Sequence, residues 1–229
     1  MRAVRALVAA SVALALTVGV SSVASAKRSD KAAAEKALLT KADLPNGGEG
    51  WSREKPDPAA DREADRIRKG IFECFDIRRV TASSKRYRAQ GPTFARKTRA
   101  GHRRVNDIAY VFPNVRAARS YLAPFLADDG IECFRKTLLE QLERGTVRGT
   151  KVLVQSVEKP PGLGDSSVGY ALPATLTNPD GREQTIYFDA IAVRVGRGVT
   201  GLTFQSPSKS FPDERAVVEA AMKRLERVL

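Results

Sequence analysis

Few residues of this 229-residue chain could take part in chemistry. It contains one histidine, His102, and two cysteines, Cys74 and Cys133, each within a Glu-Cys-Phe tripeptide. A structural zinc site needs about four ligands, which two thiols and one imidazole cannot supply. We therefore expect no metal site, and no motif indicates a cofactor. What the two thiols do depends on the compartment in which the protein folds.

The first 26 residues have the organisation of a secretory signal peptide. Arg2 and Arg5 precede an uncharged, mostly apolar run over 6–19, and Ala24-Ser25-Ala26 supplies the small residues at which a signal peptidase cleaves. The apolar core is about 15 residues long, whereas a helix needs about 20 to span a bilayer. We expect cleavage after Ala26, with a retained anchor as the alternative. No cysteine lies near the cleavage site, which excludes lipid attachment there.

Export gives the cysteine pair a simple interpretation. In an oxidising compartment, Cys74 and Cys133 are expected to form one disulfide. It would close a loop of roughly 60 residues, for which chain entropy predicts a stabilisation of roughly 4 kcal/mol. Two buried free thiols and an intermolecular bridge are the alternatives.

A short block in the second half suggests one kind of catalysis. Gly164-Asp165-Ser166-Ser167 resembles the block that carries the nucleophile in one family of serine esterases. Acyl transfer through Ser166 needs a general base that accepts the hydroxyl proton. His102 lies upstream in a basic stretch, and the Asp-x-x-His that this esterase family carries near its carboxyl terminus is absent. We expect no enzyme, and keep an extracellular hydrolase acting through Ser166 as an alternative.

Gly196, Gly198 and Gly201 form the pattern G-x-G-x-x-G. This pattern binds dinucleotides where a strand leads through the glycines into a helix. Here the glycines lead into a strand-like run over 199–205. The pattern therefore predicts a tight hairpin turn, in which glycine permits a positive φ.

The clearest charge signal is a run over 77–106 that has ten basic side chains and no acidic one. Most are arginines, whose guanidinium binds two oxygens of an oxyanion at once, and Tyr87 and Phe94 lie among them. The run predicts a surface for a phosphate-bearing wall polymer, an anionic lipid headgroup or extracellular nucleic acid. The alternative is a solvated loop and edge strand that only keep the protein soluble. The candidate ligand-binding residues are Arg78, Arg79, Lys85, Arg86, Arg88, Arg96, Lys97, Arg99, Arg103 and Arg104.

The composition is that of an ordinary globular domain, with 42% hydrophobic and 28% charged residues. Loss of Arg2 and Arg5 with the signal peptide lowers the net charge from +13 to +11. We expect residues 27–229 to form a single secreted domain without a transmembrane segment. Partners are expected among anionic envelope polymers, lipid headgroups or other proteins, and intracellular nucleic acid is not expected.

Apolar periodicity predicts how these residues are positioned. Helices are expected over 32–39, 61–75, 113–127 and 130–144, with Pro124 kinking the third or delaying its start. A strand is expected over 105–112, where a short apolar run ends at a proline.

After Gly145 the period changes to two. Four strands of an antiparallel meander are predicted over 151–158, 167–177, 185–195 and 199–205, followed by a helix over 212–229. These elements predict an α+β domain, with an antiparallel sheet of five or six strands packed against helices.

Short motifs add a resemblance to a known group of proteins. Leu38-Leu39-Thr40-Lys41-Ala42-Asp43-Leu44-Pro45, followed by Gly50-Trp51, is similar to the opening of a group of actinobacterial secreted and lipoprotein domains. Gly164-Asp165 before a strand and the segment 189–196 add to the likeness. The group includes the PknH-like extracellular sensor domain of membrane kinases. This sequence differs in having no kinase region, no membrane segment after the signal and one cysteine pair where such domains often have two.

The resemblance implies an α+β fold, a location in the cell envelope and ligand sensing or binding in place of catalysis. We therefore expect a secreted cell-envelope binding or sensor-like module that recognises an anionic ligand or an envelope component. Besides the hydrolase, a structural envelope protein that binds another protein is the alternative.

Overall fold

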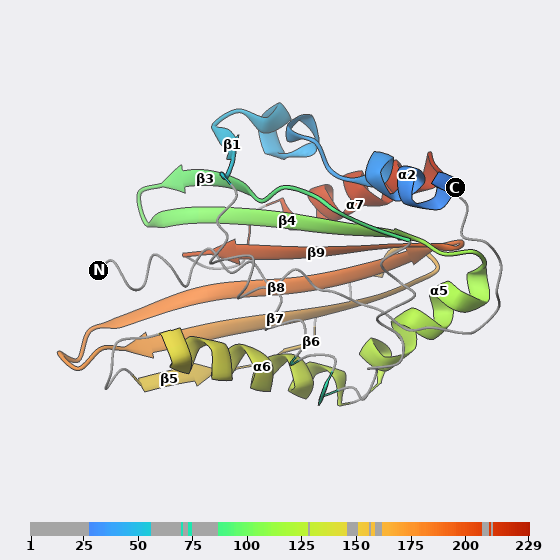
Figure 1. The fold of residues 1–229 in the computed structure, drawn as a ribbon. Coiled ribbons are helices and arrows are strands. Elements are labelled where there is room, and N and C mark those ends of the chain that lie inside the picture. Colours follow the sequence, from blue (N-terminus) through green and yellow to red (C-terminus); the bar gives the residue numbers. More distant parts are fainter. Residues whose placement is uncertain are drawn as a thin grey trace.

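One antiparallel sheet of nine strands runs through the described part of the chain (Figure 1). The structure is a computed structural model that describes residues 28–55, 70, 73–74, 87–127, 129–145, 151–155, 157–158, 162–207, 211 and 213–229. The strands are β1 (Trp51–Arg53), β2 (Arg88–Gln90), β3 (Phe94–Thr98), β4 (Gly101–Val111), β5 (Lys151–Val154), β6 (Val157–Glu158), β7 (Ser166–Thr177), β8 (Glu183–Val195) and β9 (Gly198–Ser206). The helices are α2 (Arg28–Ala37), α5 (Val115–Leu122), α6 (Gly130–Gly145) and α7 (Glu214–Glu226), with short 3-10 helices η1 (Lys41–Asp43), η2 (Pro45–Gly48) and η4 (Ala123–Leu126).

The sheet order is β1-β3-β4-β9-β8-β7-β5, while β2 also pairs with β4 and β6 with β7. This arrangement confirms the α+β class and the antiparallel sheet. It has more strands than the five or six expected. β1, β2 and β3 were not among the predicted strands, and the strand predicted over 151–158 is divided into β5 and β6. Runs of three residues, such as β1 and β2, show no readable alternation of apolar and polar residues.

The meander predicted for the second half is confirmed. β7, β8 and β9 pair in sequence, and the turn between the last two contains Gly196 with a φ of 52°. Gly198 starts β9, where a Cβ atom would lie 2.7 Å from the Leu225 side chain of α7. The glycine pattern thus forms a hairpin turn beneath a closely packed helix.

The helices between β4 and β5 also follow the prediction. α5 begins after Asn114, whose side chain accepts a hydrogen bond from the Ala117 N–H at 2.9 Å. Regular α-helix ends at Leu122, and Pro124 lies in the 3-10 turn that follows. α6 then covers the predicted second helix.

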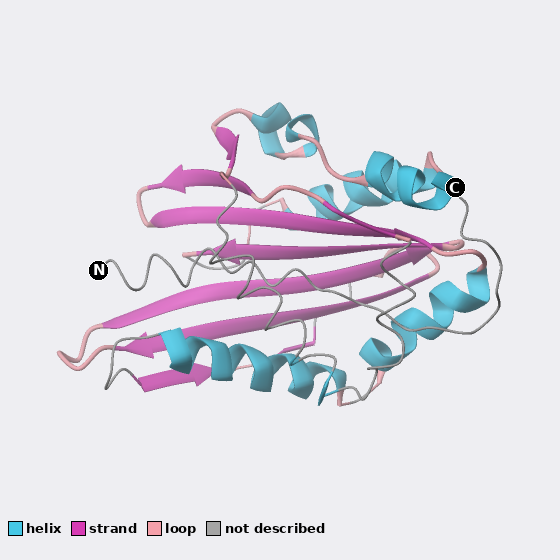
Figure 2. Cartoon of the chain, in the orientation of Figure 1, coloured by secondary structure: helices cyan, strands magenta, loops and turns pink. Residues whose placement is uncertain are grey.

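Helices pack on both faces of the sheet, with α2 and α7 on one side and α5 and α6 on the other (Figure 2). Ile108 and Tyr110 of β4 point to what we call the α6 face, where Phe134 and Leu138 of α6 belong to the same apolar cluster. Val105 and the other alternate residues of β4 point to the opposite, α7 face. Successive residues of β4 therefore lie on opposite faces of the sheet, in contact with different helices.

Two predicted elements lie outside the described residues. The signal peptide over 1–26 is one, and the helix over 61–75 is the other except for Gly70, Glu73 and Cys74, which are helical. Within the part that is described, no helix combines the length and the apolar character needed to cross a membrane.

Candidate functional site

The two cysteines lie in disulfide geometry, in agreement with the predicted pairing. Their Cα atoms are 5.7 Å apart, and the bond links Cys74 to Cys133 in the first turn of α6. The Cys133 side chain is buried. The pair therefore ties a residue that precedes the basic run to the layer of helices on the α6 face.

Six of the ten basic candidates lie within the described residues. Arg78, Arg79, Lys85 and Arg86 lie outside them. Five of the remaining six belong to the hairpin of β3 and β4 and its turn, namely Arg96, Lys97, Arg99, Arg103 and Arg104.

Arg88 is separated from this hairpin by the length of a strand. It lies opposite Tyr110 in β4, six residues from Arg104, a distance of about 20 Å along the strand. Its guanidinium donates a hydrogen bond to the side chain of Gln90 at 3.0 Å. Arg88 therefore does not belong to the same surface as the hairpin residues.

Two arginines face one another across the hairpin. Arg96 lies directly opposite Arg103, and Lys97 lies opposite His102. Like charges at directly opposite positions destabilise a pair of strands. Among the described residues, no carboxylate forms an ion pair with Arg96, Lys97, Arg99 or Arg103.

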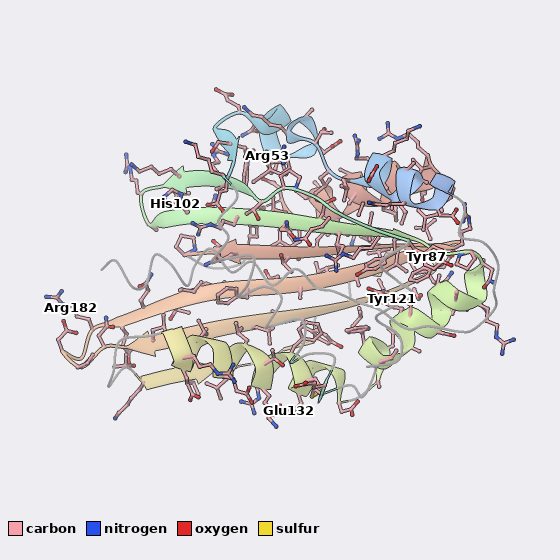
Figure 3. All side chains as sticks on the ribbon, in the orientation of Figure 1. Arg53, Tyr87, His102, Tyr121, Glu132 and Arg182 are labelled. Atoms are coloured by element: carbon pink, nitrogen blue, oxygen red, sulfur yellow. A yellow bond between two sulfur atoms is a disulfide. The ribbon has the colours of Figure 1, made fainter. Side chains whose placement is uncertain are left out.

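Strand β1 adds a cation that the sequence analysis missed. Arg53 lies opposite Phe94 of β3, on the same face as Arg96, and its side chain is exposed. Figure 3 shows Arg53 and His102 toward the side of the sheet that carries this hairpin. The arginine lies outside the basic run, and a strand of three residues gave no signal that would place it there. We call Arg53, Arg96 and Arg103, which share the α7 face, the hairpin cations. By the same alternation Lys97 points to the α6 face, and Arg99 lies in the turn between β3 and β4.

The backbone before β1 lies close against one of these side chains. A Cβ atom at Gly50 would lie 3.3 Å from Nε of Arg96, and the φ of Gly50 is 72°. Trp51 follows, lies opposite Arg96 and is buried against Phe211, with 5.7 Å between the ring centroids. The Gly50-Trp51 motif thus anchors the short strand beside Arg96.

Arg104 has a different environment from its neighbour Arg103. Because side chains alternate along a strand, Arg104 points to the α6 face, where it is 8% exposed. Its Nε donates to Oε1 of Glu54 at 2.8 Å. Arg104 therefore does not lie on the surface that Arg96 and Arg103 share.

The esterase-like block forms a structural anchor. Asp165 accepts hydrogen bonds from Arg194 at 2.8 Å and from the Gly196 N–H at 2.7 Å. Arg194 is buried, and its Nε donates to the Ser166 hydroxyl at 3.0 Å. These bonds fix the start of β7 against the end of β8.

The histidine lies at the other end of the sheet from this serine. Ser166 is level with Tyr110, through Arg194 and Val199 on the strands between them. Tyr110 and His102 are eight residues apart on β4, which corresponds to about 27 Å. His102 therefore does not reach the Ser166 hydroxyl.

The opening motif also has structural contacts. Oδ2 of Asp43 accepts hydrogen bonds from the backbone and the hydroxyl of Thr40 at 2.6 and 2.7 Å. Asp43 also pairs with Arg224 of α7 at 3.3 Å, and Leu44 is buried. The motif holds the segment between α2 and β1 against the last helix.

One buried carboxyl group has an altered affinity for protons. Burial raises the pKa of Asp107 to about 7, although the Leu39 N–H and the nearby Arg224 act in the opposite direction. The Leu39 N–H donates to Oδ2 of Asp107 at 2.7 Å. A Cβ atom at Gly91 would lie 2.0 Å from the other carboxyl oxygen, so glycine is needed there.

Other shifted groups lie away from the hairpin. Burial raises the pKa of Tyr121, which lies in the aromatic core on the α6 face. On the exposed surface of α6, Arg135 donates to Glu132 at 2.7 Å, which lowers the pKa of Glu132 and raises that of Arg135. None of the three is close in sequence or sheet position to the hairpin cations.

Comparisons with known proteins give little beyond a weak structural likeness. No family model matches the chain, and no curated protein sequence matches it. The extracellular domain of PknH from Mycobacterium tuberculosis is 13% identical over 85% of this chain and 96% of that domain, with a TM-score of 0.37. CalU16 from Micromonospora echinospora is also 13% identical, over 62% of this chain and 83% of that one, with a TM-score of 0.17. Both TM-scores are below 0.5, so neither likeness enters the argument below.

Proposed function

We propose that this protein is a secreted, non-catalytic module of the cell envelope that binds an anionic ligand through the hairpin cations. The observation that carries the proposal is the opposed pair Arg96 and Arg103, which has no carboxylate partner among the described residues. A bound oxyanion would lie between the two guanidinium groups and turn their repulsion into attraction. A phosphate-bearing envelope polymer or an anionic lipid headgroup has this chemistry.

Two features support a location outside the cytoplasm. Residues 1–26 have the pattern of a signal peptide, and Cys74 and Cys133 have disulfide geometry. The short motifs that resemble those of actinobacterial envelope domains support a sensor-like role for the module. Together they favour ligands found in the cell envelope.

The proposal of a non-catalytic role rests on the surroundings of Ser166. Its hydroxyl accepts a hydrogen bond from Arg194, a permanent cation that cannot act as a general base. The alternative of a structural protein that binds another protein uses the same surface if the partner is acidic, so the ligand must be tested directly.

Titration with polyphosphate tests the proposed surface. We expect the double variant Arg96→Gln/Arg103→Gln to bind polyphosphate at least tenfold more weakly in 0.15 M salt, because it removes the opposed pair. The matched control Arg116→Gln/Arg119→Gln removes the same charge from exposed positions of α5 and is expected to change the affinity less than twofold. Isothermal titration calorimetry measures both.

An equal loss of affinity in the two double variants would contradict the proposal. It would mean that polyphosphate responds to the overall positive charge of the protein and has no preferred surface. Salt dependence provides a second readout, since each lost phosphate contact reduces the slope of affinity against salt concentration.

A further inference from the structure

The hairpin cations present hydrogen-bond donors and no acceptors. Each guanidinium carries five N–H groups and stays charged across the physiological pH range. Within the described part of the chain, Arg53, Arg96 and Arg103 have no ion-pair partner. A ligand that satisfies them must therefore bring acceptor atoms and negative charge.

The hairpin cations are accessible from solvent and close together. Arg53 is exposed, and Arg96 and Arg103 are half-buried. The Cβ atoms of Arg96 and Arg103 are about 5 Å apart, because the two residues lie directly opposite one another. Arg53 is diagonal to Arg96, at about 7 Å, a separation that long side chains span. All three guanidinium groups can therefore meet on one small ligand without a cavity.

The neighbouring residues leave this positive charge unbalanced. The carboxylate of Glu54, next to Arg53 in sequence, is bound to Arg104. Glu49 is exposed just before β1 and forms no ion pair with the hairpin cations. The three residues thus contribute three positive charges to one surface.

The aromatic residues beside the hairpin cations do not form a stacking surface. Trp51 lies opposite Arg96, and Phe94 lies opposite Arg53, but both are buried. Proteins that follow a nucleic-acid strand use accessible aromatic rings on which the bases stack. Contacts on this surface are therefore directed to the phosphate group itself, whatever it is attached to.

Phosphate groups differ in charge and in the number of free oxygens. A phosphodiester has two terminal oxygens and one negative charge. A phosphomonoester has three terminal oxygens and a charge between about −1.5 and −2 at pH 7. The second form matches three donors and three positive charges more closely.

We infer that the hairpin cations bind a phosphomonoester in preference to a phosphodiester. The inference rests on the proposed function and narrows its ligand to a terminal phosphate group. The three terminal oxygens accept hydrogen bonds from Arg53, Arg96 and Arg103, and the additional negative charge offsets the repulsion of the opposed pair. A soluble phosphate ester and the headgroup of phosphatidic acid share this chemistry.

A matched pair of small ligands tests the preference. The ¹⁵N-labelled mature protein is titrated at pH 7.5 with glycerol 3-phosphate, a monoester, and with glycerophosphoglycerol, a diester. We expect the monoester to bind at least fivefold more tightly, since one more unit charge about 4 Å from a cation changes affinity about fivefold in water. Arg96→Gln/Arg103→Gln is expected to remove the difference, whereas Arg116→Gln/Arg119→Gln is expected to retain it.

The pH dependence of binding gives a second readout. The second proton of a phosphomonoester dissociates with a pKa of about 6, so its affinity is expected to rise about fivefold from pH 5 to 7.5. The diester has no proton to lose in this range, so its affinity is expected to stay constant. His102 is next to Arg103 but points to the other face, and His102→Gln is expected to retain the pH dependence.

Vesicles distinguish the two sources of a phosphomonoester. Binding to phosphatidic acid vesicles, without binding to glycerol 3-phosphate or to phosphatidylglycerol vesicles of equal charge, would identify a lipid surface. Similar affinity for glycerol 3-phosphate and for phosphatidic acid would identify a free phosphate ester.

Equal affinity for the monoester and the diester would overturn the inference and leave the anion site of the proposed function in place. Binding of polyphosphate without binding of either monoester would have the same meaning. Failure of polyphosphate and of every phosphate ester to bind would contradict the proposed function as well.

Discussion

At the scale of single residues, burial strongly changes the protonation of Asp107. This residue is 1% exposed, and one of its carboxyl oxygens accepts a hydrogen bond from the Leu39 N–H. Arg224 and Asp43 are the charged groups that act on it from α7 and from η1. The carboxyl therefore lies where the opening motif meets β4 and the last helix.

The raised pKa of Asp107 predicts that stability falls as the pH rises. Between its ordinary pKa of 3.8 and its value of about 7, the folded chain holds a proton that the unfolded chain has released. The stabilisation is complete below about pH 4 and lost as the pH passes 7, with a total effect of roughly 4 kcal/mol. Urea unfolding of the wild type and Asp107→Asn from pH 4 to 8 measures it.

We expect Asp107→Asn to remove this part of the pH dependence and to be more stable than the wild type at pH 8. The amide keeps an acceptor for the Leu39 N–H without a buried negative charge. Parallel stability curves for the two proteins across this range would contradict the assignment to Asp107.

At the scale of elements, β4 determines which face of the sheet each of its basic residues lies on. Its alternation sends Arg103 to the face shared with Arg96 and sends Arg104 to Glu54. Charge counting along the sequence detected the basic run but could not assign faces, because the pairing of β3 with β4 was not readable. Arg53 came to the same surface from a strand outside the run.

Regular elements were predictable where the apolar pattern was long. β7 and β8 have 12 and 13 residues, and their alternation is visible in the sequence, as is the interruption of helix at Pro124. β1 and β2 were missed because partners distant in sequence determine such short pairings. The position of Arg104 opposite Gln205 was not predictable either, since the pairing of β4 with β9 brings the two residues together.

The disulfide between Cys74 and α6 has a predictable effect on stability. The bond joins residues 59 positions apart, and the chain-entropy relation gives about 4 kcal/mol for a loop of this length. We expect Cys74→Ser/Cys133→Ser to lower the free energy of unfolding by this amount, measured in urea without reductant. The matched control is the wild type under a reducing agent, which is expected to unfold at the same midpoint. A double variant as stable as the oxidised wild type would contradict the pairing.

At the scale of the whole molecule, the hairpin cations lie together at one end of the sheet. They are carried by β1, β3 and the start of β4. The net charge of +13 attracts anions to the molecule in general. We propose that the arrangement of Arg96 opposite Arg103 directs them to one place.

The central claim is therefore best tested by mapping where an anion binds. Titration of the ¹⁵N-labelled mature protein with polyphosphate, followed by NMR, reports the guanidinium and amide signals of individual residues. We predict saturable shifts concentrated at Arg53, Arg96 and Arg103, with little change at Arg116 and Arg119 of α5. Shifts of similar size at all exposed arginines, without saturation, would contradict the account.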